Sequence, residues 1–415
     1  MTAEIVSVGT ELLLGQIVDR NAATLGVLFA ECGVIHRHRQ TVGDNLDRLV
    51  EALRFALSRS DLVVTIGGLG PTQDDLTRDG IAAALDDDLV LDEAVVTHLK
   101  EVFARRGLAW VESNTRQAMR PRSGSIIPNP NGTAPGLVCR KAGKIVIALP
   151  GPVNEFDPML ETSVRSLLEA LGGGQVLLSR TLRIAGMGES LVEARLGDLM
   201  ESQNPTVAPY AKTAEVHLRL TARAVDRIGA IALLDPVEEA IRGRLGDAIY
   251  GVDDETLEYA VVTALQKHRA TAAVAESCTG GLLGGRLTAV PGSSEVFLGG
   301  VIAYANAVKE RMLGVPRSIL DTDGAVSERC AAAMATGARE AFNSDYALSI
   351  TGIAGPDGGS DAKPVGLVYL GIATPTGVTV HEQKFRGRRE TIRDRAAQYA
   401  LLLLRRALLE RDRRS

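Results

Sequence analysis

Short apolar runs alternate with amphipathic segments through the first 170 residues of the chain. Runs rich in β-branched residues predict three buried strands, at 5–8, 62–66 and 145–149. Between them apolar residues recur at helical spacing, which predicts helices such as 46–57. Strands that alternate with helices in this way are typical of an α/β fold with a mainly parallel sheet.

The pattern changes after a glycine-rich stretch at 171–174, which we interpret as a linker. Val216, Leu218 and Leu220 alternate with polar residues, which indicates a sheet with one solvent-exposed face. The segment predicts a small α+β unit with strands and helices at 176–184, 189–200, 206–210, 216–222 and 236–245. A unit of about seventy residues has little interior to bury, so we expect its apolar face to be covered. A second copy of the chain would cover it in a homodimer held by the first and middle domains; packing within one chain is the alternative.

The last part of the chain returns to alternating strands and helices. A helix is expected from Leu257, and strands are expected at 272–275, 296–305 and 346–350. Each strand is followed by small or reactive residues, and open α/β sheets bind ligands beyond the carboxyl ends of their strands. The first of these strands leads through Ser277 into a helix, whose free backbone N–H groups can hold a phosphate or an oxyanion.

Composition narrows the possible classes of protein. A chain of 415 residues predicts several domains, which we place at 1–170, 175–250 and 253–415. The net charge of −5 argues against broad nucleic-acid binding. Four scattered cysteines without a Cys-x-x-Cys pair suggest reduced thiols rather than disulfides or a zinc site. With no signal-peptide pattern and no apolar run that would span a membrane, we expect a cytoplasmic protein.

Three separated motifs carry a resemblance to a known family. They are the Ala275–Gly281 segment, the group of Tyr304, Asn306 and Lys309, and the Ser349–Gly359 segment. Together they resemble the nicotinamide-nucleotide amidase family, which converts nicotinamide mononucleotide to nicotinate mononucleotide and ammonia. The resemblance covers residues from about 253 to 410 and implies an α/β amidase domain.

Amide hydrolysis needs a nucleophile and a base, and no histidine lies near these motifs. Ser277 is the expected nucleophile and Lys309 the expected base, with Tyr304 relaying the proton or orienting the lysine. Lys309 can act as a base only if its pKa is well below the ordinary value. If the two residues have only structural roles, Ser277 caps a helix and Lys309 lies on the surface. Cys278 competes as nucleophile, although we expect it to be packed.

The substrate's other groups also need partners. Glycines bring backbone N–H groups close to phosphate or ribose, and arginines four residues apart on a helix share a face. We cannot choose from spacing alone which arginine pairs with the phosphate. The expected binding residues are Thr279, Gly280, Gly281, Asn306, Thr351, Gly352, Gly355, Arg389 and Arg393. No cofactor is expected in this domain.

The first domain has its own strand-end motifs. A glycine-rich loop, 67–70, follows the second predicted strand, and Thr10 and Glu11 follow the first. We expect a phosphate-binding site made by Thr10, Glu11, Gly67, Gly68 and Gly70. Asp44, Asp74 and Asp75 are the candidate ligands of a divalent metal, and Asp74 alternatively complements the dipole of the next helix.

These motifs resemble the molybdopterin-binding fold, and more closely the form that precedes an amidase domain in the CinA family. That resemblance implies a three-layer α/β domain with ADP-ribose pyrophosphatase activity that depends on Mg, Co or Mn. Leu69 replaces the threonine of molybdopterin-binding relatives, which argues against molybdopterin handling.

The resemblance also implies a KH-like middle domain. Glu189 places negative charge where a KH loop would hold a phosphate, so we expect a structural role rather than nucleic-acid binding. The alternative for the whole chain is a competence- or damage-related regulatory protein whose first domain is catalytically silent.

Overall fold

The computed structural model describes residues 1–173 and 175–413. Gly174 of the expected linker, and Arg414 and Ser415 at the end of the third predicted domain, lie outside the described residues. The chain divides into two compact units. The first comprises 1–178 with 222–233, and the second comprises 179–221 with 234–415.

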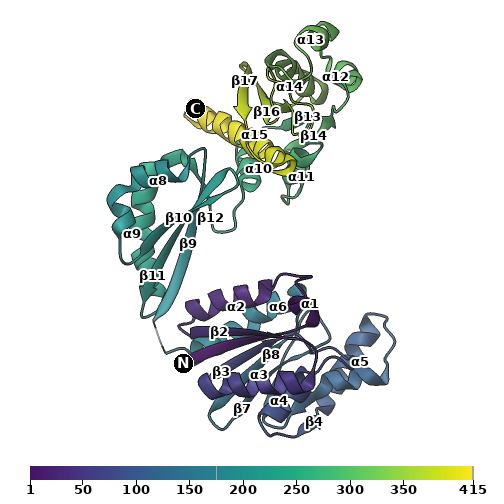
Figure 1. Cartoon of the computed structure of the whole chain (residues 1–415), viewed down its shortest axis with the longest axis vertical. Helices are drawn as coiled ribbons and strands as arrows, with labels where there is room; N and C mark the ends of the chain where they lie inside the picture. Colours follow the sequence, from purple (N-terminus) through teal and green to yellow (C-terminus); the bar gives the residue numbers. More distant parts are fainter. Residues whose placement is uncertain (174, 414–415) are drawn as a thin grey trace. The chain divides into compact units, whose positions relative to one another are not determined.

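A six-stranded sheet organises the first unit (Figure 1). Its strands in spatial order are β2 (Ile35–Val42), β1 (Thr2–Val8), β3 (Leu62–Ile66), β8 (Lys144–Leu149), β7 (Gly136–Lys141) and β6 (Gly124–Ile127). The first four are parallel and the last two are antiparallel, which confirms the mainly parallel sheet. The helices are α1 (Thr10–Leu13), α2 (Arg20–Glu31), α3 (Leu46–Arg59), α4 (Thr77–Ala84), α5 (Glu93–Arg105), α6 (Val153–Met159) and α7 (Arg165–Leu171).

The central strands β1, β3 and β8 are buried on both faces, because alternate residues of each strand enter different cores, whereas the edge strand β2 is largely exposed. In β8, Ile145 and Ile147 pack with α2 and α6, whereas Val146 and Ala148 pack with α3 and α4. The near-continuous apolar runs seen in the sequence are therefore strands with two buried faces. The arrangement confirms the three-layer α/β fold.

A small two-stranded sheet, β4 (Leu89–Leu91) with β5 (Met119–Pro121), lies between α4 and β6 in sequence. Helix α5 follows β4, and its apolar residues Val96, Leu99 and Val102 are buried. A loop at 128–135 then connects β6 to β7. Sequence patterns did not predict this part of the fold.

The middle segment forms a four-stranded sheet in the order β10 (Thr206–Lys212), β11 (Glu215–Ala224), β9 (Val176–Ala185) and β12 (Ile249–Val252). Its helices are α8 (Glu189–Leu196) and α9 (Arg227–Leu245). The prediction that α9 would begin at Pro236 is wrong, since the helix starts nine residues earlier and accommodates the proline in its interior.

Val216, Leu218 and Leu220 are buried within a single chain. The apolar face that we had expected a second copy to cover is therefore already covered. The homodimer stays a prediction, but this face no longer supports it.

The second unit also contains a five-stranded sheet (Figure 1). Its strands in order are β14 (Phe297–Ile302), β13 (Ala272–Glu276), β15 (Tyr346–Gly352), β16 (Leu367–Thr374) and β17 (Gly377–Lys384). The first three are parallel and the last two antiparallel. The helices are α10 (Leu257–His268), α11 (Leu282–Thr288), α12 (Asn306–Leu313), α13 (Arg317–Thr322), α14 (Glu328–Phe342) and α15 (Arg389–Asp412).

Two apolar cores again cover the two faces of this sheet. Val274 of β13 packs in the core with α10, α11 and α15, and Ala273 and Ala275 pack in the core with α14. Because β13, β14 and β15 are parallel, their carboxyl ends meet at one edge of the sheet.

Among the helices of the described residues, none combines the length and the apolar character that a membrane span requires.

Candidate functional site

Ser277 lies immediately beyond β13, at the sheet edge where the parallel strands end. Its backbone N–H donates to the carbonyl of Ile350 on β15, at 2.9 Å, which anchors the turn to the neighbouring strand. The residue is 9% exposed. The serine is therefore held at the strand end, as the sequence predicts, rather than in the first turn of a helix.

Lys309 reaches this serine from α12. Its Nζ lies 3.1 Å from Oγ of Ser277, 2.6 Å from the carbonyl oxygen of Ala303 and 3.3 Å from that of Tyr304. The lysine is 1% exposed, and all three of these partners are neutral oxygens. Burial lowers the pKa of Lys309, because removing water disfavours the charged ammonium. The alternative of a surface lysine is wrong.

The Tyr304 side chain does not point to the lysine in the way that we expected. Its hydroxyl accepts a hydrogen bond from Arg389 at 3.2 Å, and its backbone carbonyl makes the contact with Lys309. The side chain is exposed. Tyr304 thus orients Lys309 through the main chain, and a proton relay through the hydroxyl has no support in this arrangement.

Glu276 occupies the helix N-terminus that the sequence suggested would be open to a ligand. Its buried carboxylate accepts hydrogen bonds from the N–H groups of Gly281, Leu283 and Gly284, at 3.0, 3.1 and 2.8 Å. The expectation that these amides hold phosphate or oxyanion is therefore wrong, since a side chain of the same turn already satisfies them. Sequence reasoning missed this role of Glu276, although an acid next to a glycine-rich turn could have indicated it.

The backbone N–H groups of Cys278 and Thr279 remain as donors in the turn. In the described part of the chain, no main-chain acceptor bonds either group. The Cys278 thiol itself is buried, and burial raises its pKa to about 11. A thiol with this pKa is protonated at neutral pH, which makes Cys278 a poor nucleophile beside Ser277.

Both candidate arginines come from the start of α15, but they bond to different loops. Arg389 donates to the carbonyl of Gly355 at 2.8 Å, and Arg393 donates to the carbonyl of Thr279 at 2.6 Å. Among the residues described, Nε of Arg393 and the hydroxyl of Thr279 are buried without a hydrogen-bond partner. Two such groups beside one turn are a place where a polar ligand group would complete the bonding.

The other predicted residues of this domain have varied surroundings. Thr351, at the end of β15, is buried and donates its hydroxyl to the carbonyl of Ala325 at 2.6 Å. Asn306 is exposed at the start of α12. A Cβ at Gly352 would lie 2.7 Å from the carbonyl oxygen of Leu367, so that glycine permits close strand packing. Gly280 and Gly281 have positive φ angles of 59° and 95°, which the turn requires.

The predicted residues of the first unit line one cavity of about 620 Å³ at the carboxyl ends of its parallel strands. Glu11, Asp44, Gly67, Gly68, Gly70, Asp74 and Asp75 all contribute to its lining. Thr10 is joined to it through Asp44, whose Oδ2 accepts hydrogen bonds from the Thr10 N–H and hydroxyl at 3.0 and 2.7 Å. The structure therefore brings together residues that are far apart in sequence.

The glycines of the 67–70 loop are required by close contacts. Gly67 has a φ of 103°, and a Cβ there would lie 2.3 Å from the carbonyl oxygen of Val8. A Cβ at Gly70 would lie 2.4 Å from Oδ2 of Asp75. The loop thus leaves room for the neighbouring strand and for the Asp75 carboxylate.

Asp74 and Asp75 lie before α4, not in its first turn, which contains Asp79 instead. Oδ2 of Asp75 accepts hydrogen bonds from the N–H and hydroxyl of Thr72, at 2.9 and 2.5 Å. Asp74 lies two residues ahead of the Leu76 N-cap, and interaction with the helix dipole stays the alternative to metal binding. Both carboxylates face the cavity from its loop.

Arg78 supports the loop from behind and was missed in the sequence. It is buried and donates to the carbonyls of Leu69 and Gly70, at 2.7 and 3.3 Å. Burial lowers its pKa to about 10, so the guanidinium stays charged at neutral pH. A basic residue directly after the acidic loop was the available signal. Asp19, Gln117 and Glu155 also line the cavity and were likewise missed.

The donor set of this cavity suits a hard divalent cation held in part by its substrate. In the ranges 1–173 and 175–413, no three His, Cys, Asp or Glu side chains are arranged to enclose a metal. Mg²⁺ is commonly bound by one or two carboxylates together with substrate phosphates and water. Asp44 and Asp75 each engage Oδ2 with a threonine, and among the described residues no hydrogen bond engages either Oδ1.

Three family models match successive parts of the chain. The "Probable molybdopterin binding domain" matches residues 4–170, the "Damage-inducible protein CinA KH domain" matches 179–251, and the "CinA C-terminal domain" matches 254–408. A solved structure of the competence/damage inducible protein CihA from Agrobacterium tumefaciens is 42% identical. It covers 37% of this chain and 93% of its own, with a TM-score of 0.36.

Two full-length relatives are similar along almost all of the chain. The CinA-like protein of Kosmotoga olearia is 47% identical over 410 residues, which cover 99% of each protein. The CinA-like protein of Dictyoglomus thermophilum is 48% identical over 410 residues, which cover 99% of this chain and 100% of the relative. This chain therefore belongs to the CinA family.

Proposed function

We propose that the C-terminal domain hydrolyses the carboxamide of nicotinamide mononucleotide to nicotinate mononucleotide and ammonia. The contact between Lys309 Nζ and Ser277 Oγ, in a buried strand-end site, carries this proposal. A neutral amine beside a hydroxyl is a nucleophile–base pair, and burial lowers the pKa of Lys309, which favours the neutral amine.

In the first half of the reaction, Ser277 Oγ forms a bond to the carboxamide carbon while Lys309 accepts the hydroxyl proton. The carbonyl oxygen becomes an oxyanion, for which the N–H groups of Cys278 and Thr279 are the available donors. The carbon–nitrogen bond then breaks, and Lys309 returns the proton to the leaving nitrogen. Ammonia departs and nicotinate mononucleotide remains esterified to the serine.

In the second half, water attacks the ester carbon while Lys309 accepts a proton from it. The bond to Ser277 Oγ breaks and the serine regains its proton from Lys309. No net proton is consumed by the protein, and Lys309 returns to the neutral form in which it began. This sequence requires only the groups that the strand-end site holds close together.

For the phosphate of the substrate we choose Arg393 over Arg389. The guanidinium of Arg393 has a buried Nε without a partner next to the unpartnered Thr279 hydroxyl. Arg393 makes one bond, to the Thr279 carbonyl, whereas Arg389 makes two, to Gly355 and Tyr304. A phosphate provides three acceptor oxygens, which suits the two groups that lack bonds.

The test is ammonia release from nicotinamide mononucleotide by purified full-length protein, native and with Ser277→Ala or Lys309→Ala. We expect both substitutions to abolish release while circular dichroism and the unfolding temperature show a folded protein. Full activity of Ser277→Ala would contradict the proposal. Full activity of Lys309→Ala would be compatible with Ser277 as the nucleophile but would show that Lys309 is not its base.

We also propose that the N-terminal domain cleaves ADP-ribose with a divalent metal. The cavity in which Asp44, Asp75 and the 67–70 loop converge favours this second activity. Glycines at a strand end allow close approach of a diphosphate, and the buried Arg78 adds fixed positive charge behind the loop. When bound, a divalent ion would neutralise part of the diphosphate charge, with Asp44 and Asp75 holding it.

The rival is a regulatory protein whose N-terminal domain binds nucleotides without cleaving them. Incubation with ADP-ribose and Mg²⁺, Co²⁺ or Mn²⁺, followed by chromatography for AMP, distinguishes the two. Formation of AMP supports the pyrophosphatase. Absence of AMP with every metal, in protein whose amidase is active, would favour the regulatory role.

A further inference from the structure

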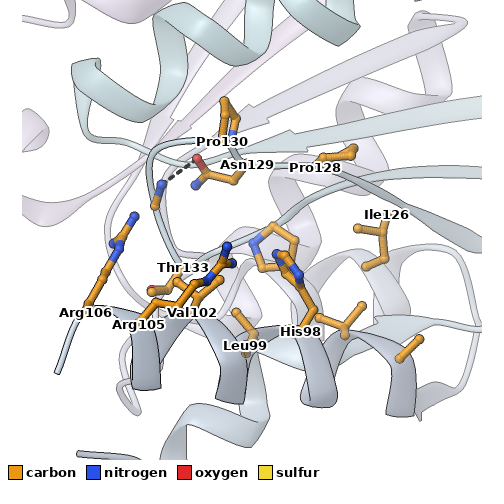
Figure 2. Close-up of a pocket in the computed structure, with 14 residues that line it drawn as sticks. His98, Leu99, Val102, Arg105, Arg106, Ile126, Pro128, Asn129, Pro130 and Thr133 are labelled. Atoms are coloured by element: carbon orange, nitrogen blue, oxygen red, sulfur yellow. Dashed lines mark hydrogen bonds between the residues drawn. The ribbon is translucent and has the colours of Figure 1, made fainter. Parts of the chain in front are cut away.

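A second cavity, of about 710 Å³, lies between α5 and the 128–135 loop of the first unit. Figure 2 shows His98, Leu99, Val102 and Arg105 projecting from the helix toward the loop that carries Pro128 and Pro130. A volume of this size is in the range of small-molecule sites, on the order of 300–1,000 Å³. Neither proposed reaction uses it.

The walls of this cavity are mainly apolar and its rim is cationic. Val95, Leu99, Val102 and Ile126 supply aliphatic surface, and prolines of the loop supply rigid apolar rings. Arg105 and Arg106 lie at one end of α5, as Figure 2 shows, and both are exposed. The combination indicates a ligand with a flat apolar part and negative charge attached to it.

The loop that forms one wall also borders the strand-end cavity. Thr133 lines both cavities. Asn129, in the apolar cavity, donates to Glu155 of the strand-end cavity at 2.6 Å. Within this loop the Gly132 N–H donates to Oδ1 of Asn129 at 2.8 Å, and Figure 2 marks a hydrogen bond at the Asn129 side chain. The two cavities are therefore neighbours that share a single loop.

A buried amide marks the junction between them. Gln117 lines the strand-end cavity, is 2% exposed and donates to the Thr133 hydroxyl at 3.2 Å. Its carbonyl oxygen is buried without a hydrogen-bond partner among the residues that the structure describes. A polar group of a ligand that passes Thr133 would satisfy it.

We propose that the apolar cavity binds the nucleobase of a nucleoside diphosphate whose diphosphate occupies the strand-end cavity. This inference rests on the proposed pyrophosphatase and assigns its substrate specificity. The base packs between α5 and the loop prolines, the ribose passes Thr133 and Gln117, and the guanidiniums at the rim attract the negative charge. The apolar walls remove the faces of a base from water, and bases stack on the planes of arginine guanidiniums.

A sugar is the less suitable occupant of the apolar cavity. Each sugar hydroxyl that leaves water needs a hydrogen-bond partner, and aliphatic walls provide none. Asn129, Thr133 and His98 can satisfy only a few groups at the edge of a ring. The base therefore enters this cavity, and the second sugar of a substrate such as ADP-ribose remains on the strand-end side.

The test uses Ala94→Trp, which places a large ring in the cavity from an exposed lining position on α5. Ala104→Trp is the matched control, since Ala104 is exposed on the same helix but does not line the cavity. Binding of AMP to the full-length protein is measured by calorimetry, and hydrolysis of ADP-ribose is measured with metal. Arg105→Ala provides a second variant that leaves the walls intact.

We expect Ala94→Trp to weaken AMP binding and to raise KM for ADP-ribose about tenfold, with kcat nearly unchanged. Arg105→Ala should weaken AMP binding by a smaller factor, and Ala104→Trp should behave as the native protein. Unchanged AMP affinity in Ala94→Trp would overturn the inference. So would a change from dimer to monomer in Ala94→Trp with AMP binding intact, because the cavity would then be a subunit interface.

The same measurements distinguish an inactive pyrophosphatase from a cavity that does not bind the base. If native protein binds AMP, loses that binding in Ala94→Trp, and cleaves no ADP-ribose, the base site stands and the activity does not. If native protein cleaves ADP-ribose and the KM is the same in all three variants, the activity stands and the base site is wrong.

Discussion

Lys309 Nζ lies 3.1 Å from Ser277 Oγ, although the two residues are 32 positions apart in the chain. The lysine comes from α12, after β14, and the serine follows the adjacent strand β13. The parallel pairing of these strands brings both residues to one sheet edge. The other hydrogen bonds of the Lys309 amine go to backbone carbonyls, and within the described residues no carboxylate pairs with it.

Ser277 and Cys278 are adjacent, and their variants separate the two possible nucleophiles. We expect Ser277→Ala to lower kcat about 1000-fold or more, since removal of a nucleophile disables its base as well. Cys278→Ala should keep at least half of the native activity, because burial holds the thiol protonated. Initial rates of ammonia release measure both. A large loss in Cys278→Ala together with activity in Ser277→Ala would reverse the assignment.

The pH dependence of the amidase should report the lowered pKa of Lys309. The base must be neutral, so kcat/KM should fall as pH decreases through that pKa and protonates the amine. The acid limb should therefore lie below the ordinary lysine value of 10.5. Rates with nicotinamide mononucleotide across a pH series give the profile. A limb that coincides with the ordinary lysine value would contradict a desolvated base.

The same burial should make Lys309 a cost to stability. In the folded state the protonated lysine is disfavoured, so stability should rise as pH increases from the lowered pKa toward the unfolded value. Lys309→Met should raise stability at neutral pH by about 1 kcal/mol and remove this dependence, while activity is lost. Urea unfolding followed by circular dichroism measures the change. A destabilised Lys309→Met would mean that the three hydrogen bonds outweigh desolvation.

Glu276 should be a structural requirement of the serine turn. Glu276→Gln replaces an acceptor-only carboxylate by an amide, whose NH₂ group faces backbone donors. We expect a loss of about 2–4 kcal/mol of stability, because a buried charge-assisted network is broken. Glu340→Gln, at an exposed position, serves as the control. Equal urea midpoints for the two variants would show that the turn does not depend on the carboxylate.

Phosphate recognition should depend more on Arg393 than on Arg389. We expect Arg393→Ala to raise KM for nicotinamide mononucleotide about tenfold or more, through the loss of a charge-assisted contact. Nicotinamide riboside lacks the phosphate, so its kcat/KM should change little in this variant. The same measurements on Arg389→Ala provide the comparison. If Arg389→Ala raised KM for the mononucleotide more than Arg393→Ala did, without affecting the riboside, Arg389 would be the phosphate-binding residue.

Metal-dependent cleavage should require the two threonine-bonded carboxylates. We expect Asp44→Asn and Asp75→Asn each to lower AMP formation about 100-fold and to leave ammonia release unchanged. Asp47→Asn changes an exposed acid of α3 that does not line the cavity, and its AMP formation should match that of the native protein. If Asp44→Asn and Asp75→Asn also match the native rate, these carboxylates do not hold the metal.

The sequence determined the central strands of the sheets and the places where chemistry could occur. Strands such as 62–66 and 272–276 are buried on both faces, so their apolar runs were visible without a structure. Because parallel strands end at a common edge, residues that follow them could be assigned to one site. Ser277 and Lys309 were predicted in this way together with the family resemblance, and Asp44 and Asp75 from their match to motifs of molybdopterin-binding relatives. Periodicity did not predict the start of α9 correctly, because proline is common in the first turn of a helix and Pro236 was taken to mark the first turn, although it lies in the interior.

Only the tertiary structure decided how the side chains at those edges are paired. Burial of Lys309 depends on packing around α12, and the direction of Tyr304 depends on Arg389 at the start of α15. Glu276 closes the helix N-terminus that local sequence left open. Arg78 and the apolar cavity beside α5 arise from segments that approach one another across the chain. Local patterns indicate whether a segment favours a helix or a strand, whereas contacts between distant segments depend on how the whole chain packs.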